Sequence, residues 1–371
     1  MKFLTFTTIF LTVMIILTIL ISRRFVRKLH FSKKTKLFIN IFLGINLLGV
    51  IGYMFARYNP SIPNWAYFLL SIPIGIIFVL FVATIFYEIS SRILNVIPMS
   101  NNRREFFKKS LDISSVAIAG SINAKAMYNA KQIELEKVDV KIKDLKQSYS
   151  IVQLSDIHIG GLIDQEFIKN LVKRVNLLNP DIIVITGDLV DTNLIYAKNA
   201  LDELKNLKSK YGNYFIVGNH EYFHGVASII DYINTLNFKT LENENTYIGE
   251  EKKGFNLAGV YDVIGYRINN YEPDLKKALE GIEPSPTVLL AHQPKFIEEV
   301  TNVDLVLSGH THGGQIAPFN LLVKIVQPYV KGLHQHNKKT QIYVNKGTGF
   351  WGPPMRLCAS SEITYLKLIP A

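Results

Sequence analysis

Two histidines, His310 and His312, stand two residues apart in the stretch SGHTHGGQ, directly after the apolar run DLVL. Imidazole is a common ligand of transition metals, and alternate residues of an extended chain can face the same side. Three glycines in the same stretch give the backbone freedom and keep bulk away from the pair. A polar turn would explain one such motif equally well, so its interpretation depends on the rest of the chain.

Four other apolar runs also end in residues that can bind a metal. They end in Asp156-x-His158, Gly187-Asp188, Gly218-Asn219-His220-Glu221 and His292. In an open α/β sheet, ligand sites lie beyond the carboxyl ends of the strands, so these side chains should converge. Mixed imidazole and carboxylate donors suit Mn, Fe, Zn or Co better than Ca or Mg. At least seven donors are present, which is more than one ion needs but suits two ions about 3.5–4 Å apart that share a carboxylate.

The elements that must position these residues alternate between strand and helix. The predicted strands are 137–142, 148–156, 181–188, 214–220, 256–260, 287–292, 304–310, 341–347 and 362–368. The predicted helices are 165–178 and 199–210, from their apolar periodicity. This alternation predicts a sheet with parallel strands, and the later strands, which are separated by loops, predict a second, mixed sheet.

The first third of the chain is predicted to lie in a membrane. Residues 3–22, 37–56 and 58–87 contain no charged side chain, and about 20 apolar residues span a bilayer as a helix. We therefore expect transmembrane helices at 3–22, 37–56 and 66–87, with Trp65 and Tyr87 as interfacial aromatics at the ends of the third.

Charge is unevenly distributed along the chain. Residues 1–110 hold 14 of the 41 Lys and Arg and two of the 30 Asp and Glu, which leaves 27 basic and 28 acidic residues for the remainder. A nucleic-acid-binding protein would carry its positive charge on the folded domain, so nucleic acid is not an expected partner. The single cysteine, Cys358, excludes an intramolecular disulfide.

The distribution of Lys and Arg predicts the topology. Residues 23–36 carry seven and residues 92–109 carry five, so the positive-inside rule places both segments, and the C-terminal part after three spans, in the cytoplasm. An alternative stays open, because RREFFKKS (103–110) resembles a twin-arginine export signal and 111–126 could be a weak fourth span.

The order D-x-H, G-D, G-N-H-E, H and G-H-x-H resembles the calcineurin-like metallophosphoesterase superfamily over about residues 146–371. The resemblance implies an α/β fold in which a double β-sandwich flanked by helices follows the transmembrane helices. It places one metal on Asp156, His158 and His312, a second on Asn219, His292 and His310, and Asp188 between the two. His220 matches the family's catalytic histidine, which binds no metal and lies beside the phosphate.

The expected organisation is three transmembrane helices in 1–92, a linker in 93–145 that could form an amphipathic helix or a weak fourth span, and a metallophosphoesterase domain in 146–371. The blocks SDIHIG, TGDLVD, GNHEY and SGHTHGGQ, and the closing KGTGFWGPPMRLCASSEITYLKL, are similar to a bacterial membrane-associated branch of the superfamily. That branch includes a UDP-2,3-diacylglucosamine diphosphatase of lipid A synthesis.

The resemblance implies hydrolysis of a phosphoester or pyrophosphate by a hydroxide bridging two divalent ions, with Mn preferred to Fe, Zn or Co. It also implies a location in the bacterial inner membrane, with the bilayer and an amphiphilic phosphate-containing substrate as partners. UDP-2,3-diacylglucosamine is the expected substrate. The alternatives are a phosphatase or phosphodiesterase acting on another phospholipid, a nucleotide or a phosphoprotein, and a membrane binding module without catalysis.

The other candidate residues have a structural interpretation beside the functional one. Glu221 could orient His220 or cap the next helix, and Asp191 is expected to support its loop. Arg356 could bind phosphate or form a surface salt bridge. The remaining candidates are surface or substrate-loop histidines at His224, His334 and His336, a cleft wall or core packing at Phe350 and Trp351, and apolar insertions for acyl chains at 222–250 and 316–336.

Overall fold

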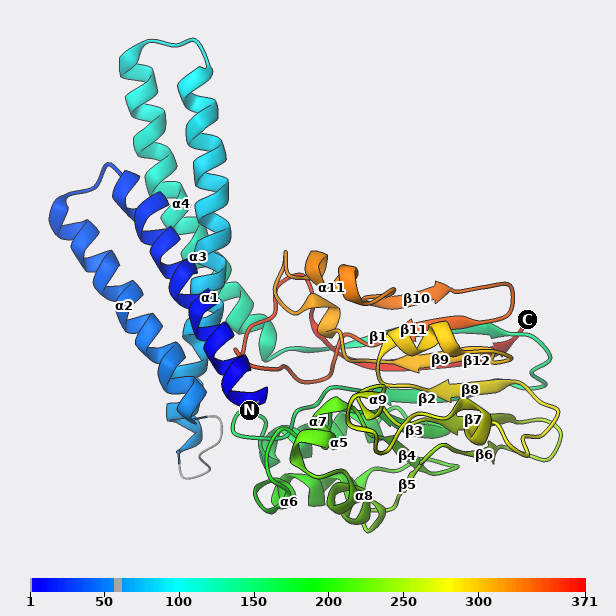
Figure 1. Cartoon of the computed structure of the whole chain (residues 1–371). Helices are drawn as coiled ribbons and strands as arrows, with labels where there is room; N and C mark the ends of the chain where they lie inside the picture. Colours follow the sequence, from blue (N-terminus) through cyan, green and yellow to red (C-terminus); the bar gives the residue numbers. More distant parts are fainter. Residues whose placement is uncertain (1, 57–61) are drawn as a thin grey trace. The chain divides into compact units, whose positions relative to one another are not determined.

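The computed structural model describes residues 2–56 and 62–371, which form two compact units (Figure 1). The first unit extends to Tyr128 and includes Gly352–Met355. The second unit contains Asn129–Trp351 and Arg356–Ala371.

The first unit consists of long helices. They are α1 (Lys2–Arg24), a short 3₁₀ turn (Val26–Lys28), α2 (Lys33–Ala56), α3 (Asn64–Val96) and α4 (Asn101–Ala130). Among the described helices, three are long and apolar enough to cross a membrane: Thr5–Lys28, Lys33–Ala56 and Asn64–Val96. Large apolar side chains such as Phe38 and Phe86 lie on their outer surface, as contact with lipid would require. The three predicted spans are therefore present as helices, and the third continues to Val96.

Polar contacts attach α4 to the other helices of the first unit. Buried Asp112 accepts hydrogen bonds from Tyr87 Oη at 2.8 Å and from the backbone N–H of His30, and its Oδ2 lies 2.9 Å from His30 Nδ1. Arg104 of the twin-arginine pair donates to the carbonyl oxygen of Asn95 in the last turn of α3 at 2.9 Å and to that of Ile97, directly after α3, at 3.3 Å. Tyr87 at the end of the third predicted span is buried inside this unit, and its position at the membrane interface stays a prediction.

The first sheet of the second unit has six strands. Their order is β1 (Ile133–Ile142), β12 (Ser361–Pro370), β2 (Tyr149–Leu154), β3 (Ile182–Thr186), β4 (Asn213–Ile216) and β5 (Phe238–Thr240). All neighbours are parallel except β12 and β2. The strands β2, β3 and β4 run in one direction, so their carboxyl ends lie at the same edge of the sheet.

The second sheet is mixed, as the sequence predicts. Its order is β10 (Gly332–Gln335), β11 (Gln341–Val344), β9 (Leu305–Ser308), β8 (Thr287–Leu290), β7 (Phe255–Gly259) and β6 (Glu244–Ile248). The four strands from β11 to β7 are parallel, and the outer strands β10 and β6 are antiparallel to their neighbours.

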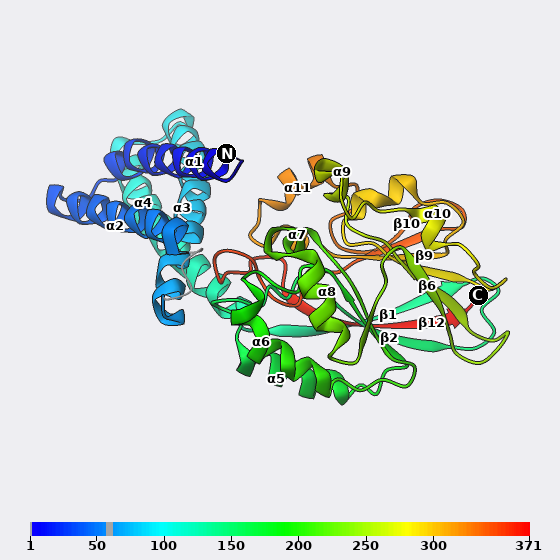
Figure 2. The same cartoon turned by 60° about the horizontal axis from the view of Figure 1, so that its bottom comes forward.

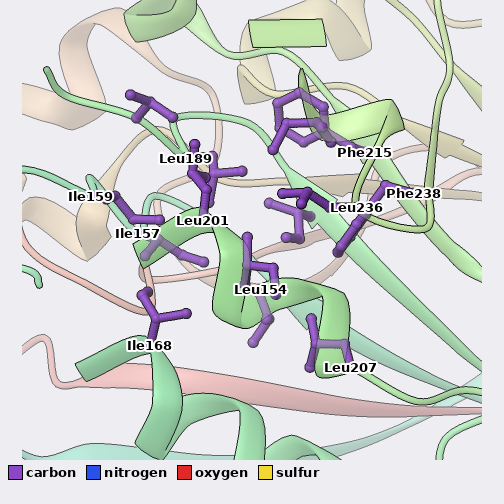
Figure 3. Packing of buried hydrophobic residues seen from close by; sticks show 14 of the residues in the cluster. Leu154, Ile157, Ile159, Ile168, Leu189, Leu201, Leu207, Phe215, Leu236 and Phe238 are labelled. Carbon is purple, nitrogen blue, oxygen red and sulfur yellow. The ribbon is translucent and has the colours of Figure 1, made fainter. Parts of the chain in front are cut away.

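Alternation along the strands builds a core on each side of the first sheet. In β2, Ile151 points between the two sheets, whereas Val152 packs on the outer face. The outer face is covered by apolar residues of α5 (Gln165–Asn176), α6 (Leu194–Asp202) and α8 (Val226–Asn234) (Figures 1 and 2). Figure 3 shows part of this cluster, in which Leu154 and Phe215 of the sheet pack near Leu201 of α6. The expected double β-sandwich flanked by helices is confirmed.

The remaining helices are short. They are η2 (Glu203–Asn206), α7 (Asn219–His224), α9 (Gly265–Ile268), α10 (Leu275–Ala278), η3 (Pro294–Glu299), η4 (His312–Gly314) and α11 (Asn320–Val326).

Two sequence predictions need correction here. The predicted helix 199–210 begins earlier, at Leu194, and ends in a 3₁₀ turn at Asn206. Within the segment 222–250, Ile229, Ile230 and Ile233 of α8 are not available to acyl chains, because they are buried in the core, whereas Phe223 is exposed. The helical spacing of these three residues directs them to one face of α8, which packs on the sheet.

Candidate metal centre

Five strands deliver the predicted site residues to one place. β2 is followed by Asp156 and His158, β3 by Asp188, and β4 by Asn219 and His220. In the second sheet, β8 leads to His292, and β9 leads to His310 and His312. The convergence predicted from the strand ends is therefore present in the structure.

The backbone at these strand ends is strained. Asp156, His158, Asp188, His310 and His312 all have positive φ angles, between 50° and 68°. Residues other than glycine rarely adopt this conformation, and strain of this kind is concentrated at functional sites. The turns therefore aim side chains inward at the expense of local stability.

Gly309 shows why the loop after β9 needs glycine. A Cβ atom at this position would collide with the side chains of Ser155 and Asp156. The close approach lets the next N–H, that of His310, donate to both carboxylate oxygens of Asp156, at 3.0 and 2.9 Å. Ser155 Oγ donates to the same carboxylate at 2.6 Å, so the orientation of Asp156 is fixed.

One cluster of potential ligands contains Asp156, His158 and His312, all buried. His158 Nε2 lies 3.0 Å from His312 Nε2, and the latter nitrogen lies 3.4 Å from Asp156 Oδ1. Two imidazole nitrogens that face each other and a carboxylate form a donor set suited to a transition metal ion.

A second cluster contains Asp188, His292 and His310. His292 Nε2 lies 3.2 Å from Asp188 Oδ2 and 3.2 Å from the side-chain oxygen of Asn219. The other nitrogen of His292 contacts the carbonyl oxygen of Thr186 at 2.7 Å, which fixes the ring with Nε2 towards the cluster.

Asp188 lies between the two clusters. Its Oδ2 is 3.9 Å from His158 Nε2 in one cluster and 3.2 Å from His292 Nε2 in the other. All seven predicted ligands are thus brought together, with Asp188 between the two clusters. The donor set fits two divalent ions, and the individual ligand assignments remain predictions.

Burial favours the neutral form of most of these imidazoles. Burial lowers the pKa of His158 and of His310 to about 3, and burial together with Arg356 lowers the pKa of His312 well below its ordinary value. Neutral imidazole is the form that binds a metal. Burial also opposes charge on His292, but the neighbouring Asp188 more than offsets this and raises the pKa of His292 well above its ordinary value.

His220 lies outside these two clusters but forms a third group of potential ligands with His158 and Asp191. Its Nε2 lies 3.9 Å from Asp188 Oδ2, and its Nδ1 lies 2.7 Å from Asp191 Oδ1. His224, which we expected at the surface or in a substrate loop, lies 3.6 Å from the same Asp191 oxygen. Asp191 therefore orients His220, a more specific contribution than the loop support predicted from the sequence.

Glu221 has a structural role that the sequence left open. Its fully buried carboxylate accepts four backbone N–H groups, from Asp188, Leu189, Val190 and Gly218, at 2.7–3.0 Å. Glu221 thus caps the start of α7 and at the same time holds the loop that carries Asp188.

Arg356 corrects a prediction. It is neither on the surface nor free to bind phosphate, because it is fully buried and donates to the carbonyl oxygens of His312 and Lys346 at 2.9 and 2.7 Å. Its Nη2 also lies 3.2 Å from His312 Nδ1. Arg356 therefore supports the ring of His312 from behind.

Phe350 and Trp351 were both considered for a cleft wall or for core packing, and each has one of these roles. Phe350 packs against the core on the outer face of the first sheet. The rings of Trp351 and His220 meet edge to face with their centroids 5.9 Å apart, so Trp351 forms part of the surroundings of the site.

His334 and His336 lie on the β10 hairpin and belong to none of the ligand clusters found in the described residues.

Donors of this kind at the strand ends of a two-sheet α/β fold define a class of protein, the metal-dependent hydrolases of phosphoric esters. The family model of calcineurin-like phosphoesterases matches residues 149–314. An uncharacterized metallophosphoesterase of Helicobacter pylori is 38% identical over 87% of this chain and 88% of its own length. The chain therefore belongs to the calcineurin-like metallophosphoesterases and is a phosphoric ester hydrolase.

Two other relatives bear on the N-terminal helices and on the membrane. An uncharacterized metallophosphoesterase of Campylobacter jejuni is 37% identical over 99% of both chains, so the match includes the N-terminal helices. A cattle protein named as a transmembrane protein with a metallophosphoesterase domain is 37% identical over 68% of this chain and 60% of its own length. Together with the three apolar helices, these relatives indicate that the protein is associated with a membrane.

Proposed function

We propose that this protein is a membrane-anchored phosphoesterase with two divalent ions, Mn²⁺ preferred, that hydrolyses a phosphoester or pyrophosphate of an amphiphilic substrate. UDP-2,3-diacylglucosamine is the proposed substrate, cleaved at its pyrophosphate into UMP and the lipid monophosphate. The convergence of seven potential ligands, with Asp188 between the two clusters, carries the proposal of dinuclear chemistry. When bound, such ions supply a nucleophilic hydroxide at neutral pH and neutralise the phosphoryl oxygens.

His220 is positioned to serve the leaving group. Asp191 Oδ1 lies 2.7 Å from Nδ1 of His220 and fixes that side of the ring, which leaves Nε2 on the side of Asp188. A proton held at Nε2 can pass to the leaving oxygen as the phosphorus–oxygen bond breaks. The amide of Asn219 lies at the same edge and can orient a phosphoryl oxygen.

The surface near the site supports an amphiphilic substrate. The helix α11 within 316–336 has no buried residue, and Leu321, Ile325 and Val326 are 60%, 77% and 65% exposed. Ile325 and Val326 line a cavity whose wall also includes Asn219 and His310. Apolar side chains next to a polar centre can accept the apolar part of a lipid while its phosphate reaches the metals.

We further propose that the catalytic domain lies on the cytoplasmic side of a bacterial inner membrane. Two observations support this side: the positive residues of 23–36 and 92–109, and the engagement of the twin-arginine residue Arg104 at the end of α3. The neutral charge balance of residues 111–371 speaks against nucleic acid as a substrate.

The experiment offers UDP-2,3-diacylglucosamine, its deacylated form and other phospholipid or nucleotide esters to the detergent-solubilised, Mn²⁺-loaded protein. We expect release of UMP with a preference for the acylated compound of more than about tenfold in kcat/KM. Equal rates for the deacylated form would reject the lipid substrate. No metal-dependent turnover of any ester, including bis(p-nitrophenyl) phosphate, would favour the binding module instead.

A further inference from the structure

A cavity of about 770 Å³ lies next to the second ligand cluster. Asn219 and His310 are part of its lining, so it is continuous with the candidate metal centre. A substrate whose scissile phosphate lies at the metals must therefore place another part of itself in this cavity.

Three cations line the cavity from three different elements. Arg267 comes from α9, Lys295 from η3 and Lys324 from α11, and the one acidic residue of the lining is Glu298. In the described part of the chain, no carboxylate lies within 4.0 Å of any of these three cations. They differ in this respect from Lys346 elsewhere in the domain, which is paired with Glu362 at 2.8 Å.

The positive charge of the cavity is local. Residues 111–371 as a whole hold 27 Lys and Arg against 28 Asp and Glu. A net positive lining in a domain without net positive charge is suited to a small anion, since it attracts negative charge to one place rather than to the whole surface.

Hydrogen bonds between side-chain amides hold this wall together. Gln327, after α11, accepts the backbone N–H of Lys295 at 3.0 Å and donates to Gln293 at 3.3 Å. Gln293 in turn donates to buried Asp262 at 2.9 Å, and Asp262 accepts the N–H of Ile264 at 2.8 Å. The chain of contacts links η3, the end of α11 and the loop before α9, so the three elements that carry the cations are fixed relative to one another.

We infer that this cavity is an anion-binding subsite, in which Arg267, Lys295 and Lys324 bind a second phosphate or other anionic group of the substrate beyond the scissile phosphate. The inference rests on the proposed function, because the metal centre must hold the scissile group. It specifies the substrate class as a phosphoester that carries at least two separate negative groups. Arginine and lysine suit this role because both keep their charge at neutral pH and donate several hydrogen bonds to phosphate oxygens.

The test uses two substrates that share the scissile bond and differ in one phosphate. Thymidine 5′-(p-nitrophenyl phosphate) carries only the scissile diester, and its 3′-phosphorylated form adds a second anionic group. We expect the full-length, Mn²⁺-loaded protein in detergent to prefer the 3′-phosphorylated form by about tenfold or more in kcat/KM.

Variants then locate the preference. Arg267→Ala and the double variant Lys295→Ala/Lys324→Ala should each reduce the preference severalfold and leave kcat/KM for the unphosphorylated substrate within about twofold of wild type. Arg267→Lys should keep part of the preference, and Lys252→Ala, at an exposed position outside the cavity, should change nothing.

Two results would overturn the inference: equal kcat/KM of the wild-type protein for both substrates, or variants that lower both values equally. If neither these two substrates nor any ester of the earlier assay is hydrolysed, the proposed function fails instead. In that case the affinity of the protein for two nucleotides tests the subsite. Thymidine 3′,5′-bisphosphate should bind the wild-type protein more tightly than thymidine 5′-monophosphate, and the two nucleotides should bind the variants with similar affinity.

Discussion

Replacement of Glu221 should damage the metal centre without removing any predicted ligand or the predicted catalytic histidine, His220. Its carboxylate accepts four buried N–H groups, two at each oxygen: Leu189 and Val190 at Oε1, Asp188 and Gly218 at Oε2. A buried donor left without a partner costs about 1–3 kcal/mol. Glu221→Ala should therefore cost on the order of 4–12 kcal/mol, which is comparable to the whole stability of a domain, about 5–15 kcal/mol.

Glu221→Gln provides a milder and more informative change. Its amide oxygen can still accept the N–H groups of Leu189 and Val190, but its NH₂ group then faces the two donors of Asp188 and Gly218. Two unsatisfied donors predict a loss of about 2–6 kcal/mol. At about 2–4 °C per kcal/mol for a domain of this size, the melting temperature should fall by at least about 4 °C.

The assay follows thermal unfolding of the full-length protein in detergent by circular dichroism, together with its metal content by mass spectrometry. Glu251→Gln is the control, since its side chain is 89% exposed. We expect Glu221→Gln to melt earlier and to bind metal more weakly, because the loop that presents Asp188 loses half of its support. Melting and metal content equal to wild type in both Glu221 variants would refute the role assigned to this carboxylate.

Four further predictions concern the metals, the leaving group, pH and topology. Chelation should abolish activity and Mn²⁺ should restore it. Asp188→Ala should be the most damaging ligand substitution, because Asp188 would bind both ions. Full activity of this variant would contradict a dinuclear centre. His220→Ala should keep its metal while turnover falls by roughly 10²–10⁴, and a parallel loss of metal would make His220 a ligand. Metal affinity should fall as the pH drops below about 6, because burial raises the pKa of Asp156 to about 6 and the protonated carboxyl must lose its proton to bind metal. His292 must also release a proton, so calorimetry in buffers of different ionisation enthalpy should detect proton release on metal binding. A metal affinity that does not depend on pH would contradict this prediction. A reporter fused to the C-terminus should be active on the cytoplasmic side, and a periplasmic signal would reverse the proposed topology.

The sequence was sufficient for the parts of the structure that depend on repeated local patterns. The strands β2, β3 and β9 are buried on both faces, so the segments 148–156, 181–188 and 304–310 are rich in apolar residues and lack a regular polar alternation. The rule that ligand sites lie beyond the carboxyl ends of parallel strands then predicts the convergence of the metal ligands.

What could not be predicted depends on contacts between distant residues. Arg356 meets His312 only because the fold brings the last loop behind the loop after β9, and no periodicity marks that contact. The strand β10 was missed because its residues, Gly-Leu-His-Gln, lie at an exposed sheet edge and show no apolar alternation. The contact of His224 with Asp191 likewise arises from the turn of α7 and not from a motif.

The position of β12 has a consequence for how the protein is made. The last strand along the chain lies between β1 and β2, and β12 is the sheet neighbour through which β1 is attached. During synthesis β1 and β2 leave the ribosome long before β12, so both expose unpaired backbone groups that other chains could bind. The turn with Asp156 follows β2, so the metal centre should form only after residues 361–370 have been translated. Nascent chains that stop earlier would then be targets for chaperones and proteases, with their N-terminal helices already inserted in the membrane.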